Sequence, residues 1–154
     1  MSLRLATTED VDVVLRFALD FYKASPYKLM RFDRRKATEF LCSVIHSGHT
    51  IGLALIALED SKPVGILIGV QAEPVFSGVE MATELAWWVD PECRDRSAGR
   101  LMLDAYEDWA LRVGCSYVQV ASLVDLSPVE LEEFYKSRHY VQAENSFMKV
   151  IKIA

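Results

Sequence analysis

The chain has 154 residues, 51% of them hydrophobic and 25% charged, with a formal net charge of −5 at pH 7. This length and composition fit one globular domain with a sizeable core, so we expect a single domain over residues 1–154. The acidic balance argues against nucleic acid as a partner. The longest apolar run, residues 51–58, is shorter than the roughly 18 residues of a membrane span. We therefore expect no membrane partner and, because the N-terminus lacks a signal-peptide core, a cytoplasmic location.

Cysteine and histidine are few and scattered along the chain. The three cysteines are an odd number without C-x-x-C spacing, and the three histidines lack the spacing of metal ligands. We therefore expect neither a disulfide framework nor a metal site. Free cysteines are typical of a reducing compartment.

The hydrophobic pattern switches between a period of two and a period of about 3.6, which predicts strands and helices in turn. The predicted strands cover residues 3–7, 50–59, 63–71, 80–89, 116–123, 140–143 and 147–153. The predicted helices cover residues 11–22, 34–45, 98–113 and 128–137. Asp33 is placed to cap the second helix and Gly48 to end it, while Ser127 and Pro128 are typical of a helix start.

A doubly wound nucleotide-binding fold would alternate strand and helix throughout. This chain instead has three successive strands in the middle, two of them apolar throughout, as is typical of strands covered on both faces. The order predicts an α/β (α+β) fold with a mixed central sheet of about six or seven strands and helices on both faces. The sheet should be antiparallel in the middle and parallel where a helix crosses over.

Three arginines and three small residues meet where the third helix is predicted to begin. Arg94, Arg96 and Arg100 surround the small residues 97–99. A helix N-terminus offers unpaired N–H groups and about half a positive charge, and small side chains let a phosphate approach them. Arginines add fork-shaped donors. The pattern predicts a pyrophosphate site, and the alternative is a capped helix with solvated arginines.

This loop resembles the acetyl-CoA signature Q/R-x-x-G-x-G/A of the GNAT superfamily of N-acetyltransferases, with Arg94, Ser97 and Gly99 at the three defined positions. The predicted order of elements is also that of the GNAT fold. The stretches ELAWWVDPECR (84–94) and EFYKSRHY (133–140) resemble a bacterial and phage subgroup with the motif ELxWWVDPExR. The resemblance implies an enzyme, an N-acetyltransferase with acetyl-CoA as cosubstrate and no metal.

The resemblance also implies where the cosubstrate binds. The pantetheine arm would pair with the backbone of residues 87–89 between strands 80–89 and 116–123, and the pyrophosphate would rest on the loop. The implied binding residues are Trp88, Val89, Arg94, Asp95, Arg96, Ser97, Ala98, Gly99 and Arg100. Two residues depart from the family pattern. Asp95 adds a negative charge near a negative ligand, and Ser97 costs roughly 1 kcal/mol relative to glycine if its φ is positive.

In the implied reaction an amine attacks the thioester directly, so no cysteine acts as nucleophile. An amine with a pKa near 10.4 is only about one part in 10³ free base at pH 7, so a base is needed. Glu84 is the candidate, with Glu80 on the same strand face as runner-up; the alternative is that Glu84 faces outward. Tyr135 matches the family's general acid, and the alternative is a core aromatic. The amide of Val89 is the implied oxyanion donor.

The acceptor is left open between a small-molecule amine, a peptide N-terminus and a lysine side chain. Segments 25–33 and 71–81 are expected to border its pocket. The altered loop motivates a second hypothesis, a catalytically silent GNAT-like module that binds acyl-CoA or a protein partner. A third is a structural or inhibitory protein that uses only the scaffold. The apolar C-terminal stretch, residues 147–154, motivates a homodimer as a further expectation.

Overall fold

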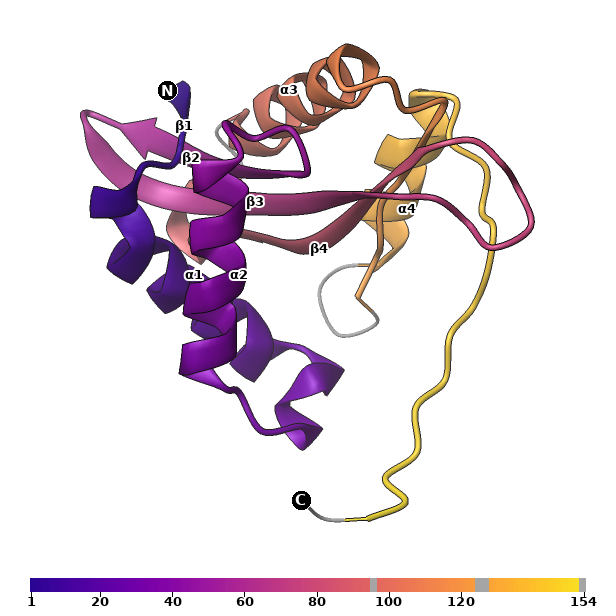
Figure 1. Ribbon diagram of the computed structural model, residues 1–154, viewed down its shortest axis with the longest axis horizontal. Coiled ribbons are helices and arrows are strands. Elements are labelled where there is room, and N and C mark those ends of the chain that lie inside the picture. Colours follow the sequence, from indigo (N-terminus) through magenta and orange to yellow (C-terminus); the bar gives the residue numbers. More distant parts are fainter. Residues whose placement is uncertain (95–96, 124–127, 153–154) are drawn as a thin grey trace.

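The computed structural model describes residues 1–94, 97–123 and 128–152 (Figure 1). Its strands are β1 (Ser2–Leu5), β2 (Gly52–Glu59), β3 (Lys62–Ala72), β4 (Met81–Val89) and β5 (Tyr117–Gln119). Its helices are α1 (Val11–Ala24), α2 (Arg34–His46), α3 (Ala98–Arg112) and α4 (Pro128–Ser137), with short 3₁₀ turns η1 (Thr8–Asp10), η2 (Pro26–Leu29) and η3 (Pro91–Cys93). The predicted order of elements is therefore confirmed as far as α4.

The five strands form one sheet in the order β1-β2-β3-β4-β5. The pairs β1–β2, β2–β3 and β3–β4 are antiparallel, whereas β5 runs parallel to β4. A parallel pair needs a long crossover, and α3 supplies it between β4 and β5. The predicted mixed sheet is confirmed, with five strands in the described chain instead of six or seven.

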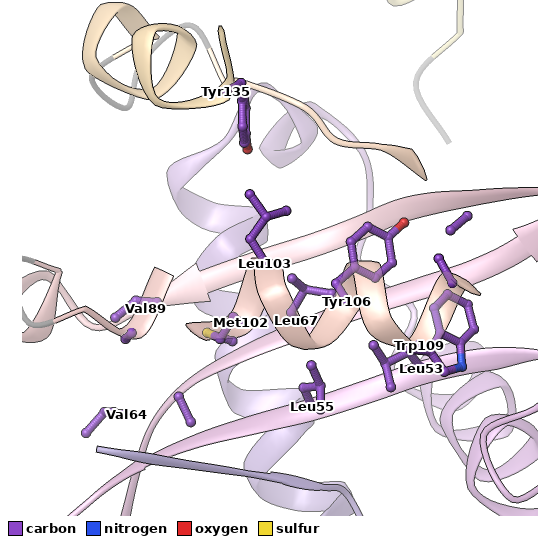
Figure 2. Close-up of a cluster of buried hydrophobic side chains, with 14 of the residues drawn as sticks. Leu53, Leu55, Val64, Leu67, Val89, Met102, Leu103, Tyr106, Trp109 and Tyr135 are labelled. Atoms are coloured by element: carbon purple, nitrogen blue, oxygen red, sulfur yellow. The ribbon is translucent and has the colours of Figure 1, made fainter. Parts of the chain in front are cut away.

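Helices cover both faces of the sheet, with α1 and α2 on one side and α3 and α4 on the other (Figure 1). Successive strand side chains point to opposite faces, so β2 sends Leu53 toward α3 and Ala54 toward α1 and α2. Figure 2 shows the α3 side of this core, where Leu103, Tyr106 and Trp109 pack over the strands. This burial on two faces explains why the buried stretches of β2 and β3 are apolar at successive positions.

Local signals define the ends of α2 as expected. The Asp33 carboxylate accepts a hydrogen bond from the Lys36 amide at 3.1 Å, which satisfies one of the free N–H groups at the helix start. Gly48, just beyond the helix, has a φ of +65°, a conformation that costs glycine little. These two residues fix where the chain turns back toward β2.

The C-terminal part of the chain differs from the prediction. The predicted strand 116–123 is shortened to Tyr117–Gln119, and the predicted strands 140–143 and 147–153 are wrong for the residues described, up to Lys152. After α4 the segment runs away from the sheet (Figure 1), with Phe147 96% exposed. Alternating apolar residues favour a strand only where a neighbouring strand accepts their backbone bonds, and here none does within the described chain.

β4 contains an irregularity that the pattern did not predict. Gly69 on β3 faces Glu84, but the preceding Ile68 faces Ala86, so Leu85 is an extra residue on β4. Such a β-bulge moves every following side chain to the other face of the sheet. Residue Ala82, two before Glu84, packs on the α3 side, whereas Ala86 after the bulge packs on the α1 and α2 side.

Candidate active site

β4 and β5 separate soon after they begin to pair. Their parallel ladder joins Met81–Thr83 to Tyr117–Gln119 and ends there, although β4 continues to Val89. Beyond the ladder, a side chain bridges the two segments: the Ala121 amide donates a hydrogen bond to Glu84 Oε2 at 3.0 Å. The second half of β4 therefore has an edge that β5 does not cover.

The ladder between β3 and β4 shows which backbone groups lie on that edge. The Asp90 amide donates to the Val64 carbonyl at 2.8 Å, which makes the facing pair Gly65 and Val89 a non-hydrogen-bonded pair. The N–H and C=O of Val89 therefore point away from β3, and by alternation those of Trp87 do the same. The backbone groups of Trp88 instead face β3.

A cavity of about 540 Å³ lies along this edge. It begins at the start of α3, runs past the second half of β4 and α4, and reaches α1 and η2. Its lining residues are Phe21, Tyr27, Glu84, Leu85, Trp87, Trp88, Val89, Arg94, Gly99, Ala121, Leu123, Glu130, Leu131, Phe134 and Tyr135. The lining brings together residues far apart in the sequence, including both of the candidate catalytic side chains.

Glu84 and Tyr135 both form hydrogen bonds with the backbone of Ala121. The Ala121 amide donates to the Glu84 carboxylate, and the Ala121 carbonyl accepts a hydrogen bond from the Tyr135 hydroxyl at 3.1 Å. Glu84 comes from β4 just before the bulge, and Tyr135 comes from α4 with only 7% of its surface exposed. The fold thus holds a carboxylate and a phenol next to each other at the wall of the cavity.

This neighbourhood shifts the pKa values of both groups. Burial raises the pKa of Glu84 to about 7, partly offset by the hydrogen bond from Ala121. Burial and the nearby Glu84 charge raise the pKa of Tyr135 above its ordinary value. At neutral pH the carboxyl can therefore accept a proton, whereas the phenol keeps its own.

The first amides of α3 lie beside the cavity. The first helical bond runs from the Leu101 amide to the Ser97 carbonyl at 3.1 Å, so the amides of residues 98–100 precede the helical ladder. The Ser97 side chain makes no capping bond, and the first turn has no acidic residue. Gly99 lines the cavity directly. These features suit an anion, because neither the Ser97 side chain nor an acidic side chain of the first turn neutralises the positive end of the helix.

Arg94 is held at the boundary between β4 and this helix start. Its Nε donates to the Val89 carbonyl at 3.0 Å, and its guanidinium carbon lies 4.7 Å from the centre of the Trp88 ring. The hydrogen bond does not use the terminal Nη groups. Asp95 and Arg96, also predicted to contact the cosubstrate, lie outside the described residues.

Some expected contributions to the site are absent from the lining. Glu80 and the segment 71–81 do not line this cavity, whereas Tyr27 of the segment 25–33 does. The roles of Ala121 and of the bulge at Leu85 were not predicted, because both depend on how distant segments pair. Within the described ranges no group of three or more His, Cys, Asp or Glu residues could hold a metal ion, and no helix is long and apolar enough to cross a membrane.

A second cavity of about 530 Å³ lies at the other end of α3, beside His49 and Arg112. No carboxylate is among its described lining residues. The cavity along β4, in contrast, combines a possible proton acceptor, Glu84, and a possible proton donor, Tyr135, beside the first residues of α3.

The acetyltransferase (GNAT) family model matches residues 15–140 of the sequence. The chain therefore belongs to the GNAT acetyltransferase family and is an enzyme of the N-acetyltransferase class. No curated protein matches the sequence.

Solved structures similar to this chain span nearly its whole length. One is AAC(6')-Iy in complex with the bisubstrate analog CoA-S-monomethyl-acetylneamine, with a TM-score of 0.75 at 10% identity over 99% of this chain and 98% of that one. Another is the ribosomal-protein-alanine N-acetyltransferase from Brucella melitensis biovar Abortus 2308, with a TM-score of 0.67 at 15% identity over 99% and 100% of the two chains. A third is the aminoglycoside acetyltransferase meta-AAC0020 from an uncultured soil metagenomic sample, in complex with sisomicin, with a TM-score of 0.70 at 16% identity over 99% and 96%. At such identities the likeness shows the shared fold.

Ser97 has a φ of +67°, a left-handed conformation that its side chain disfavours. We expect Ser97→Gly to raise the free energy of unfolding by up to about 1 kcal/mol, because glycine adopts this conformation without the Cβ penalty. Urea denaturation measures the change. Ser97→Ala is the matched control, since it keeps the Cβ and should bring no gain. Equal stabilities of the glycine and alanine variants would contradict the explanation.

The raised pKa of Glu84 predicts how the free energy of unfolding depends on pH. The folded state holds the Glu84 proton up to a pKa of about 7, whereas the unfolded chain loses it near 4.5, so ionisation costs the folded state free energy as pH rises through this window. Glu84→Gln cannot ionise. Its free energy of unfolding, relative to the unaltered protein, should therefore rise by on the order of 1–3 kcal/mol between pH 4.5 and pH 8. If the difference in free energy of unfolding between Glu84→Gln and the unaltered protein stays constant across this range, the pKa of Glu84 is not raised.

Proposed function

We propose that the protein transfers an acetyl group from acetyl-CoA directly to a primary amine. One observation carries this proposal: Glu84, Tyr135 and the outward backbone edge of β4 line the same cavity as the free start of α3. An edge that lacks a strand partner suits an extended pantetheine arm, and free helix amides suit a diphosphate.

The chain has groups that fit the cosubstrate at both ends. The amides of residues 98–100, with Arg94 and Arg100 beside them, would hold the diphosphate. The outward backbone groups of Trp87 would pair with the amides of the pantetheine arm, which leaves the outward N–H of Val89 for the reacting carbonyl. When bound, acetyl-CoA supplies the acyl group as a thioester.

Glu84 would act as the general base. The amine that enters the cavity is mostly protonated at neutral pH, and a carboxyl with a pKa of about 7 is ionised often enough to take that proton. Loss of the proton frees the nitrogen lone pair for attack on the carbonyl carbon. The outward N–H of Val89 would then stabilise the negative charge that develops on the carbonyl oxygen.

Tyr135 would act as the general acid. As the new carbon–nitrogen bond forms and the carbon–sulfur bond breaks, the sulfur leaves as a thiolate and takes the phenol proton, and the second proton lost by the attacking nitrogen restores the phenol. The Tyr135 hydroxyl keeps its proton at neutral pH and lies at the cavity wall. Neighbouring Tyr140 is engaged elsewhere, because its hydroxyl donates to Glu107 at 2.8 Å.

A catalytically silent module that binds acyl-CoA is the second candidate. The observation in its favour is Ser97, which adopts a left-handed conformation at the position where the family signature has glycine. Strain at this position weakens the loop that would hold the diphosphate. The two candidates differ in whether acetyl-CoA is consumed in the presence of an amine.

The proposal is tested first by binding. At 100 times its dissociation constant a ligand stabilises the folded state by about 2.7 kcal/mol, so acetyl-CoA should raise the melting temperature by about 5–10 °C. Gly99→Glu should abolish this shift, because it adds a negative charge at the helix start. Gly99→Ala should retain it, since a Cβ there would meet only Trp87 Cζ2 at an ordinary 3.6 Å. The absence of a shift with both acetyl-CoA and free CoA would reject the proposal, and a shift without amine-dependent thiol release would favour the silent module.

Tyr135→Phe tests the acid. Because the phenol would act only on the leaving sulfur, we expect kcat to fall by about 10²-fold or more while the dissociation constant for acetyl-CoA changes little. The ring and its packing are kept in this variant. Steady-state thiol release and calorimetric binding measure the two quantities. A fully active Tyr135→Phe variant would remove this residue from the mechanism.

A further inference from the structure

We infer that the acceptor is a primary amine with a single positive charge on an apolar body of aromatic size. This inference rests on the proposed function, because it concerns the part of the same cavity that the cosubstrate leaves free. The diphosphate end is set by the start of α3, so the amine has to approach from the opposite end, beside α1 and η2.

That opposite end is lined by apolar side chains from α1, η2, β4 and the stretch that follows β5. Phe21 of α1 and Tyr27 of η2 lie together, with ring centres 6.2 Å apart. Leu85 of β4 and Leu123 complete this wall. Aromatic rings that line a pocket bind a flat apolar body through burial of area and through ring contacts.

Two of these apolar side chains are exposed in the structure. Leu85 is 42% exposed and Tyr27 is 38% exposed, although both line the cavity. The bulge in β4 makes Leu85 the extra residue at this point of the strand. Covering these side chains with an apolar ligand would remove their surface from water, which is favourable in proportion to the area buried.

The charges of the lining argue against a polycation. The charged groups among the described lining residues are the carboxylates Glu84 and Glu130 and the guanidinium of Arg94. Glu84 has a pKa of about 7, so it is only partly ionised at neutral pH. An acceptor with several ammonium groups would therefore find only these two carboxylates as counter-charges among the described lining residues, whereas a single ammonium finds Glu84.

The volume of the cavity also favours a compact acceptor. Its volume of about 540 Å³ has to receive the thioester end of the cosubstrate as well as the acceptor. A multi-ring polar acceptor would have to leave hydroxyl groups against Phe21 and Leu85 without hydrogen-bond partners, which is costly. A compact amine with one ring avoids both problems.

The test compares amines with the full-length protein and acetyl-CoA. Acetylation of 2-phenylethylamine, tryptamine, spermidine, sisomicin and a short peptide with a free N-terminus is followed by thiol release and by product mass. We expect kcat/KM for the two aromatic amines to exceed that for each of the other amines by at least about tenfold. A preference for spermidine, sisomicin or the peptide would overturn the inference and leave the proposed function standing. If neither these amines nor those of a wider panel are acetylated, both the inference and the proposed function are overturned.

A pair of variants tests whether the acceptor binds beside Leu85. Leu85→Gln replaces an exposed cavity residue, and we expect it to raise KM for 2-phenylethylamine about tenfold without changing the dissociation constant for acetyl-CoA. Leu111→Gln is the matched control, because Leu111 is 73% exposed on α3 and is not among the lining residues. An unchanged KM in Leu85→Gln, or the same rise in both variants, would refute the location of the acceptor beside Leu85.

Discussion

The separation of β4 from β5 is the constraint on which the rest of the site depends. Paired strands satisfy each other's N–H and C=O groups, and a buried group without a partner costs free energy. Here the parallel ladder ends at Thr83 while β4 continues, and the carbonyl of Val89 is satisfied by the side chain of Arg94. The remaining outward groups face a cavity, so they are available to a ligand that supplies its own amides.

The surrounding packing keeps this opening in place. Gly69 on β3 faces Glu84, and a Cβ on this glycine would lie only 2.6 Å from the ring of Tyr106 on α3. Tyr106 in turn donates from its hydroxyl to the Gln119 carbonyl at 3.3 Å. The helix that crosses from β4 to β5 therefore holds the end of β5 in position. Ala121, two residues further, is where Glu84 and Tyr135 both find their hydrogen bonds.

The site also shows how one environment can prepare two groups for opposite tasks. Removal from water raises the pKa of a carboxyl and that of a phenol alike, because in both the charged form is the costly one. For Glu84 the shift brings the pKa to about 7, where the group can exchange a proton near neutral pH. For Tyr135 the same shift keeps the proton on the oxygen. Proximity strengthens the difference, because the Glu84 charge further disfavours the charged form of Tyr135.

The sequence by itself determined the order of elements, the central position of β2 and β3, the cap of α2 at Asp33 and the residue types at the start of α3. These features follow from side-chain periodicity and from backbone preferences that act within a few residues. Tertiary structure alone decided the bulge at Leu85, the early end of β5, the absence of the last predicted strands from the described part of the chain, and the meeting of Glu84 with Tyr135 at Ala121. Each of these depends on which distant segment a backbone group pairs with, and local periodicity carries no information about that choice.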